Sequence, residues 1–255
     1  KGRSDMKSSR LLKYFEMYVK KFDMNNMNVK ARYFHSLKSM DLARDIASSL
    51  DIFNEEEIVV CELIALFHDI GGFDTGTNYY MVEDMSNDYS MKSIEILFEG
   101  GLLRRITPDT KYDNFIKVAI YAHNKIGLPS NIDNKMKSYC KVIKDAHKID
   151  SFRMVINYPY IDTRIDSYPS GGVYEKFRGF EEVDIRLADN NADEVLVVLS
   201  SIFALNYRYS YEVLINENYI GKILNSLTFG DKNVEAFMKQ IAGVLSNYLN
   251  RKVLV

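Results

Sequence analysis

The sequence has little of what marks a secreted or membrane protein. Only two cysteines occur among its 255 residues, Cys61 and Cys140, and both lie in apolar helical patterns typical of small core side chains. No disulfide framework is implied, so a reducing cytoplasm is the expected compartment. No apolar stretch reaches the roughly 18 to 20 residues needed to span a bilayer. We recognise no charged segment followed by an apolar leader either, and we expect no membrane partner.

A strong charge of either sign is also lacking. Charged residues make up 27% of the chain, and the formal net charge is −2. The basic pairs Lys20-Lys21 and Arg104-Arg105 are short and suit solvated faces. We therefore expect no nucleic-acid partner, because binding to a phosphate backbone needs a basic stripe. A small-molecule partner fits the composition better, and nothing in it indicates an oligomeric state.

Helical periodicity is what the sequence does contain. Hydrophobic residues make up 47% of the chain, and they recur at spacings of three and four, whereas strict alternation is scarce. This pattern predicts an all-α fold. Glycine-containing stop signals follow several of the apolar runs, at 71–72, 100–101 and 127–129. The expected helices lie near residues 7–22, 28–50, 55–70, 90–104, 112–126, 135–157, 192–206, 211–228 and 233–250.

The predicted organisation has three parts. Residues 1–27 hold an N-terminal helix, and the five residues KGRSD before Met6 are a candidate vector-derived remnant. Residues 28–156 form the core domain. Residues 157–255 hold an irregular segment and C-terminal helices packed on the core. Within this last part, residues 157–184 are the least regular and leave a short hairpin open, and a role as lid, lobe or dimer surface stays open too.

The four histidines all lie on helical faces that are otherwise apolar. Positions three, four, seven and eleven apart share one face of a helix. His147, for example, continues a row that includes Cys140 and extends to Asp150. A single histidine of this kind is most often a satisfied core side chain, but that explanation becomes much weaker for four of them together. The four are His35, His68, His123 and His147.

A shared metal ion is a single explanation for these residues. Buried imidazoles and carboxylates are costly unless they are paired or bind a metal. Nitrogen and oxygen ligands suit Zn, Fe, Mn, Co or Ni. His68 and Asp69 are neighbours, so on an ideal helix their side chains point about 100° apart. Both can reach one ion near a helix end, and Gly71-Gly72 permits such an end.

These motifs resemble the HD-domain superfamily of metal-dependent phosphohydrolases. In that pattern a histidine on one helix is followed by an adjacent His-Asp pair and then by an aspartate on a later helix. The resemblance runs from about residue 28 to residue 155. Its segments here are ARYFHSLKSMDLARDIA with His35, ALFHDIGGFD with His68-Asp69, AIYAHNKIGLP with His123, and VIKDAHKIDSFR with His147.

The resemblance implies an HD-domain helical bundle with additional C-terminal helices and one divalent transition metal ion. Metal-activated hydroxide would attack the phosphorus of a nucleotide or another small phosphate ester. Lys125 and Lys148 are candidates for contacting the phosphate, and His123 for a nearby acid or a ligand to a second ion. The expected metal ligands are His35, His68, Asp69, His147 and Asp150. The expected catalytic residues are Asp69, His123, Lys125 and Lys148.

Three positions depart from the pattern of the family. Gly72 stands where relatives usually bring a basic residue, and Tyr89 where they often have a histidine. His147 stands where the last aspartate ligand is expected. A neutral imidazole there leaves the ion more positive, which favours anions, and Asp145 or Asp150 could substitute as a carboxylate. The shared helical row favours Asp150, and Tyr89 argues against a complete two-metal site.

Three functions therefore remain open at this point. The first is a metal-dependent phosphohydrolase, which we expect most. The second, motivated by the three departures, is a degenerate HD domain that acts as a binding or regulatory protein without turnover. The third is an iron oxygenase on the same scaffold, which Tyr89 makes less attractive because a histidine ligand would be missing. The sequence does not identify the substrate or the metal.

Overall fold

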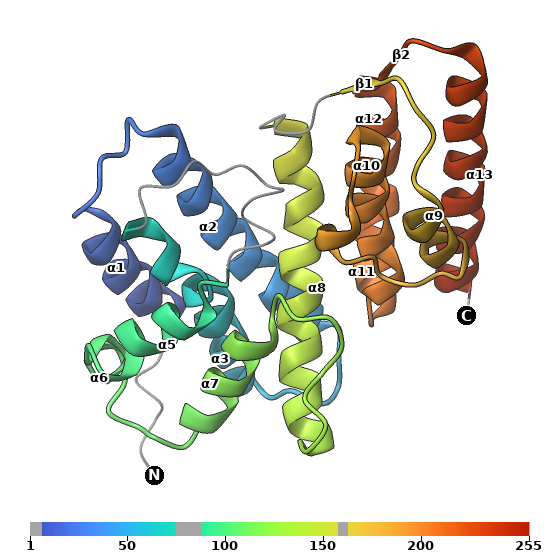
Figure 1. Ribbon diagram of the computed structural model, residues 1–255. Helices are drawn as coiled ribbons and strands as arrows, with labels where there is room; N and C mark the ends of the chain where they lie inside the picture. The colour runs from blue at the N-terminus through green and yellow to red at the C-terminus, as the bar shows by residue number, and fades with distance from the viewer. Residues whose placement is uncertain (1–6, 75–87, 158–162, 255) are drawn as a thin grey trace. The chain divides into compact units, whose positions relative to one another are not determined.

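The computed structural model describes residues 7–74, 88–157 and 163–254. Regular structure in these ranges is almost entirely helical, and the two strands found there have two residues each (Figure 1). The all-α prediction is therefore confirmed. The contacts divide the described residues into two compact units, one of residues 7–74 and 88–150, the other of residues 151–157 and 163–254. No helix in the described ranges is both long enough and apolar enough to cross a membrane.

The first unit holds all four histidines: His35 and His147 lie within α2 and α8, and His68 and His123 directly follow α3 and α7. Helix α8 starts in this unit and continues into the second. The helices are α1 (Ser8–Val19), α2 (Met27–Ser48), α3 (Glu55–Phe67), the 3-10 helix η1 (Ile70–Asp74), α5 (Ser90–Phe98), α6 (Leu102–Ile106), α7 (Asp113–Ala122) and α8 (Asn134–Asn157).

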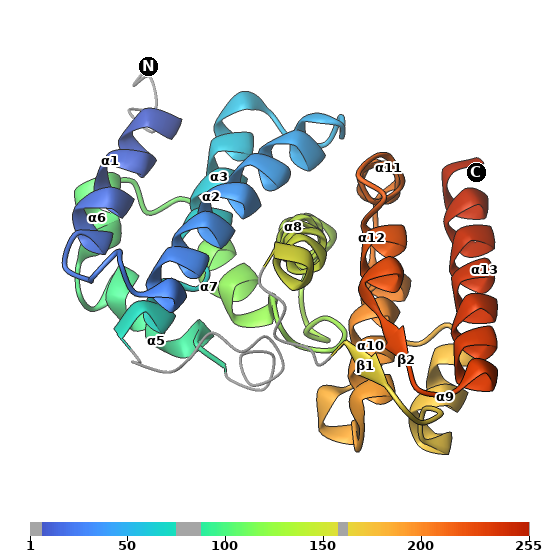
Figure 2. The same ribbon diagram turned by 90° about the horizontal axis from the view of Figure 1, so that it is seen from above.

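Helix α3 is the central helix of the first unit. Its start is fixed by a capping box in which the Asn54 side chain and the Glu57 side chain each accept from the other's backbone N–H. Every residue from Val60 to Phe67 is buried, as expected for a helix covered on all sides. Helix α2 packs along it, and α1 and α7 also contact it (Figure 2). The C-terminal end of α3 therefore lies inside the unit.

Aromatic side chains hold this buried end in place. The Phe15 ring of α1 contacts Phe67 and Phe73 edge to face, with ring centres 5.7 and 6.0 Å apart. The two phenylalanines flank the segment His68–Gly72. Packing on both sides of this short segment fixes where its histidine and aspartate point.

The second unit is a separate group of helices with its own core. The buried Phe177 ring contacts Phe203, and Phe203 contacts Tyr248, with ring centres 5.1 and 4.9 Å apart. Strand β1 (Arg164–Ile165) pairs in parallel with β2 (Thr228–Phe229). Its helices are α9 (Gly171–Arg178), η2 (Ile185–Leu187), α10 (Asn191–Ser200), η3 (Ser201–Ala204), α11 (Arg208–Asn216), α12 (Tyr219–Ser226) and α13 (Lys232–Leu254).

Two expected helices are interrupted. The run predicted at 90–104 is divided into α5 and α6 at Gly101, which has a positive φ of 70°. The run predicted at 211–228 is divided at Asn218, whose φ is 50°, because asparagine tolerates the left-handed conformation better than most residues. Apolar spacing continues across both breaks, so periodicity alone did not reveal them.

The irregular segment contains a helix instead of a hairpin in its described residues, 163–184. Strand β1 finds its partner some 60 residues later in the chain, and α9 occupies Gly171–Arg178. A parallel pair cannot be joined by a tight turn, which explains the long separation. The predicted domain limits at residues 27 and 156 and the packing of the last part on the core stay predictions.

Candidate metal centre

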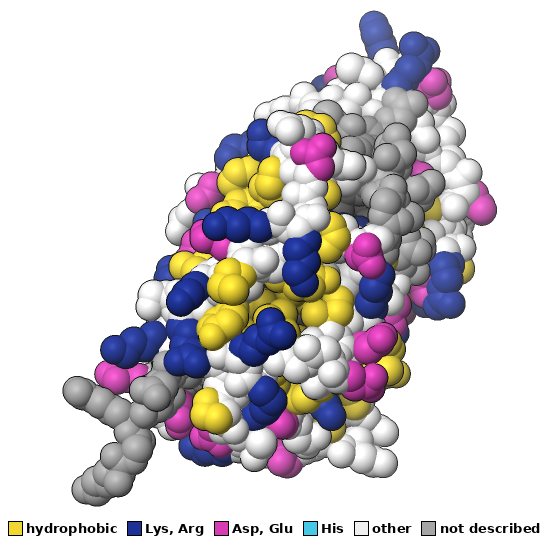
Figure 3. Space-filling view, turned by 90° about the vertical axis from the view of Figure 1, so that its left-hand side faces the viewer, with side chains coloured by type: hydrophobic (Ala, Val, Ile, Leu, Met, Phe, Trp, Pro, Cys, Tyr) yellow, Lys and Arg dark blue, Asp and Glu magenta, His cyan; other side chains and the backbone are white. Residues whose placement is uncertain are grey.

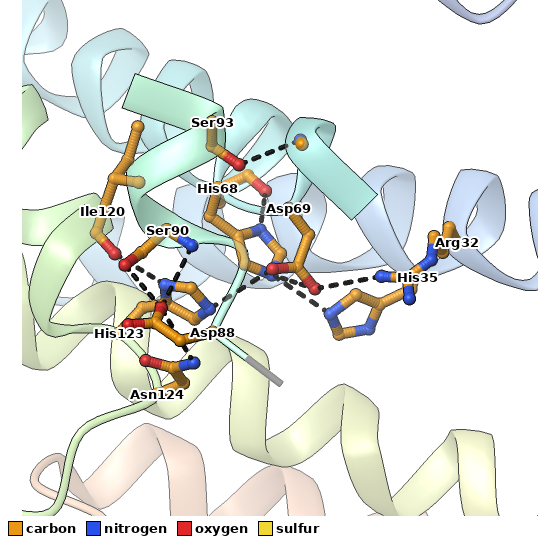
Figure 4. Close-up of polar contacts among 12 residues, drawn as sticks. Arg32, His35, His68, Asp69, Asp88, Ser90, Ser93, Ile120, His123 and Asn124 are labelled. Atoms are coloured by element: carbon orange, nitrogen blue, oxygen red, sulfur yellow. Dashed lines mark hydrogen bonds and ion pairs between the residues drawn. The ribbon is translucent and has the colours of Figure 1, made fainter. Parts of the chain in front are cut away.

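Four side chains of the first unit meet in a group that could hold a metal ion. His35 comes from the middle of α2, His68 and Asp69 follow the end of α3, and His147 comes from α8. One possible ligand atom from each lies within 4.8 Å of the others. His35, His68 and Asp69 are buried, whereas His147 is partly exposed. Figure 4 shows His35, His68 and Asp69 converging.

Hydrogen bonds at Nδ1, on the side away from the other grouped side chains, set the tautomer of two of the imidazoles. His35 Nδ1 lies 2.7 Å from Asp150 Oδ2, and His68 Nδ1 lies 2.6 Å from the carbonyl oxygen of Ala65. Both oxygens are acceptors, so we assign the ring proton to Nδ1 in each histidine. Each Nε2 then carries a lone pair.

The two Nε2 atoms face each other inside the group. His35 Nε2 and His68 Nε2 are 3.1 Å apart. Two bare acceptors at this distance repel each other unless a cation lies near both. This arrangement is what a metal ion bound by both nitrogens would require.

Burial and neighbouring charges favour the protonation states that bind metals. Burial, with additional effects of nearby imidazoles, lowers the pKa of His68 to about 3. Burial and the same neighbours hold the pKa of His147 well below its usual value. Burial alone would raise the pKa of Asp69, but the surrounding histidines hold it well below the usual range. At neutral pH His68 and His147 are therefore neutral imidazoles and Asp69 is an ionised carboxylate, as metal binding requires.

The donor set fits a divalent transition metal. Imidazole nitrogen together with one carboxylate oxygen suits Zn, Fe, Co, Ni or Mn. Hard ions such as Ca²⁺ prefer all-oxygen sites, which this group is not. His147 contributes to the group at the position where the family pattern has an aspartate. Histidine at this position thus keeps an atom that can bind the metal but carries no negative charge.

Asp150 contacts His35, and its expected role as a metal ligand stays a prediction. Its carboxylate lies on the outer side of His35, in contact with Nδ1, and it is not among the four grouped residues. A carboxylate that accepts from a metal-binding histidine fixes the ring and raises its basicity. The helical row correctly placed Asp150 near His147, but it gave no information on which ring the carboxylate contacts.

His123 lies beside the group, as Figure 4 shows. It follows α7 and its Nδ1 lies 2.6 Å from the carbonyl oxygen of Ile120. Its Nε2 is 3.4 Å from Asp69 Oδ1, and its ring centre is 4.7 Å from that of His68. The position suits a residue that holds a proton next to the carboxylate.

The two lysines are placed differently from each other. Lys125 forms an ion pair with Asp88, and its ammonium lies 5.2 Å from the ring centre of Tyr121. Burial alone would raise the pKa of Asp88, but hydrogen bonds from Lys125 and Ser90 lower it to about 2. Lys148 is buried in α8 next to His147. The phosphate-binding role of both lysines stays a prediction.

Arg32 is a site residue that the sequence analysis missed. It is 2% exposed, and its Nη1 lies 4.0 Å from Asp69 Oδ2. Its Cζ is 4.5 Å from the ring centre of Tyr89. The available signal was its position three residues before His35, on the same face of α2.

On one outward face of the molecule (Figure 3), both signs of charge are mixed with apolar side chains and no histidine is visible.

Comparison with known proteins agrees with this geometry. The family model of the HD domain matches residues 32–152, a range that contains every residue placed in or beside the group. HD domains typically bind divalent metal ions. In comparisons with curated proteins and with solved structures, nothing matches the chain significantly.

Proposed function

Since residues 32–152 place this chain in the HD-domain superfamily of metal-dependent hydrolases, we propose that it hydrolyses a nucleotide or another small phosphate ester with one divalent transition metal ion. The observation that carries the proposal is the pair of bare Nε2 atoms of His35 and His68, 3.1 Å apart within the group. A satisfied core histidine would direct that nitrogen to a donor.

The ion would be held by four side chains, those of His35, His68, Asp69 and His147. A divalent ion there would polarise a phosphoryl oxygen and acidify water near neutral pH. Asp150 keeps His35 in the form with its proton on Nδ1, and the Ala65 carbonyl does the same for His68. Burial of these residues keeps bulk water away and strengthens each electrostatic contact.

His123 is the residue best placed to move a proton. Its Nδ1 donates to Ile120, so Nε2 is the nitrogen available on the side of Asp69. When protonated at Nε2, it can donate to Asp69 Oδ1 or to the oxygen of a leaving group. We assign it the role of general acid.

A binding or regulatory protein without turnover is the second candidate. Lys125 is paired with Asp88, which reduces the positive charge it could offer to a substrate. The departures at Gly72, Tyr89 and His147 also support this candidate. The iron oxygenase has less support, because Tyr89 lies against the guanidinium of Arg32 instead of supplying an imidazole.

Release of inorganic phosphate from a panel of nucleotides and phosphomonoesters tests the proposal. The protein should be loaded in turn with Mn, Zn, Fe(II), Co and Ni. We expect metal-dependent release by the wild type and a loss of at least about 100-fold in Asp69→Asn, because a ligand and its charge are removed. Asp166→Asn, an exposed aspartate of the second unit, is the matched control and should keep full activity. Full metal content with no turnover would favour the binding protein.

A further inference from the structure

The absence of a side chain at Gly72 has a direct structural consequence. A Cβ atom at this position would lie 2.3 Å from Arg32 Nη1 and 2.7 Å from Arg32 Cζ. Such distances are impossible for non-bonded heavy atoms, so a side chain at position 72 and the guanidinium of Arg32 exclude each other. The guanidinium occupies the room that a side chain there would need.

Tyr89, the second position that differs from the family pattern, also lies against Arg32. Tyr89, which is 9% exposed, presents its ring face to the guanidinium at 4.5 Å from Cζ. A cation held over a tyrosine ring is attracted to it, more strongly when both are shielded from water. Gly72 and Tyr89, 17 positions apart in sequence, thus both lie against the guanidinium of Arg32 and help to position it.

This positive group lies at the edge of the metal centre. Arg32 Nη1 is 4.0 Å from Asp69 Oδ2, and Asp69 is one of the four grouped residues (Figure 4). Lys125 already pairs with Asp88. Arg32 therefore brings a planar, permanently charged fork next to Asp69, and such a fork matches the oxygens of a phosphate group.

We propose that Arg32 is the phosphate-binding residue of this site and that Gly72 and Tyr89 position its guanidinium. Its guanidinium takes the role of the basic residue that the family resemblance leads one to expect at position 72. The pattern is then not degraded at this point, because the cation comes from α2 instead. This inference rests on the proposed function, since it names the group that binds the substrate's phosphoryl oxygens.

Phosphate binding to the metal-loaded protein is the first test. Inorganic phosphate is titrated into manganese-loaded protein in a calorimeter, after elemental analysis of each sample. Arg32→Gln should keep its metal and bind phosphate about tenfold more weakly or worse, because a charge-assisted hydrogen bond is lost. Arg44→Gln, twelve residues further along α2 and outside the site, is the matched control and should bind like the wild type.

Gly72→Ala is a second test that leaves the arginine in the chain. The added Cβ displaces the end of a flexible side chain, so the fold should be retained. Phosphate should bind more weakly than in wild type while metal content stays the same. Gly172→Ala is the control, since a Cβ there meets nothing within 4 Å.

The outcomes separate this inference from the proposed function. Full phosphate affinity in Arg32→Gln would overturn the inference, and so would loss of metal from that variant, which would make Arg32 a positioning residue for Asp69. A wild type that holds metal but binds no phosphate would also overturn it and would leave the metal centre standing. A wild type that holds no metal would overturn both, and the elemental analysis shows that result directly.

Discussion

His35 and His68 have the most restrictive environments among the individual residues. Each has its outer nitrogen in a short contact with an oxygen and its inner nitrogen directed at the other ring. With the ring proton of each histidine on Nδ1, the two facing Nε2 atoms are both acceptors, and a cation bound by both would satisfy them. The two outer contacts also differ in chemistry, since one is a carboxylate, Asp150, and the other is a backbone carbonyl.

Asp150→Asn tests how the carboxylate behind His35 acts. The amide is isosteric but uncharged, so His35 should become a weaker ligand while all four grouped residues remain. We expect metal affinity to fall about 10- to 100-fold, as for other partners of metal-bound histidines. Competition with a chromogenic chelator measures it. Unchanged affinity would mean that Asp150 neither orients a ligand nor is one.

At the scale of elements, much of the site follows from helix geometry that the sequence displays. The helix predicted at 55–70 agrees with α3, which begins at Glu55 and ends at Phe67, and the two glycines lie in the short 3-10 helix η1 that follows. Period-3.6 rows identified the buried faces of α2 and α8. For this reason the sequence indicated that His35 and His147 point inward.

Long-range contacts explain what the sequence did not reveal. Gly72 and Tyr89 together position Arg32, and no local pattern on α2 predicts that these two residues lie beside it. The choice of Asp150 for His35 Nδ1 depends on how α8 lies against α2. The break at Asn218 was missed because apolar spacing continues through it, and the predicted helix 90–104 continued past the glycine signal at 100–101 for the same reason.

At the scale of the whole molecule, the site belongs to one of two compact units. Every grouped residue, with His123, Asp150 and Arg32, lies in residues 7–74 and 88–150, the described part of the first unit. The second unit has its own cluster of aromatic contacts and contributes none of these residues. The candidate metal centre therefore draws all of its described residues from the first unit.

Buried histidines make the stability of the metal-free protein depend on pH. Burial lowers the pKa of His68 to about 3 in the folded protein, against 6.5 for an ordinary histidine. Between these values the unfolded chain binds a proton that the folded chain does not. The free energy of unfolding should therefore fall as pH decreases from 6.5, by up to about 1.4 kcal/mol per pH unit for His68 alone. His147, whose pKa is also lowered, acts in the same direction.

Urea unfolding in the presence of a chelator at pH 7.5, 6.5 and 5.5 measures this dependence. His68→Gln should show a smaller loss of stability between pH 6.5 and 5.5 than the wild type, because one titrating group is absent. Equal losses in the two proteins would contradict the assignment of a lowered pKa to His68.

Elemental analysis of protein purified without added metal is the most direct test of the metal centre. We expect one transition metal ion per chain in the wild type, or one after incubation with Mn, Zn or Ni. We expect that His68→Ala, which removes one of the two facing nitrogens, loses the ion while the protein stays folded. Absence of metal from the wild type after incubation, or full metal content in His68→Ala, would contradict the central claim.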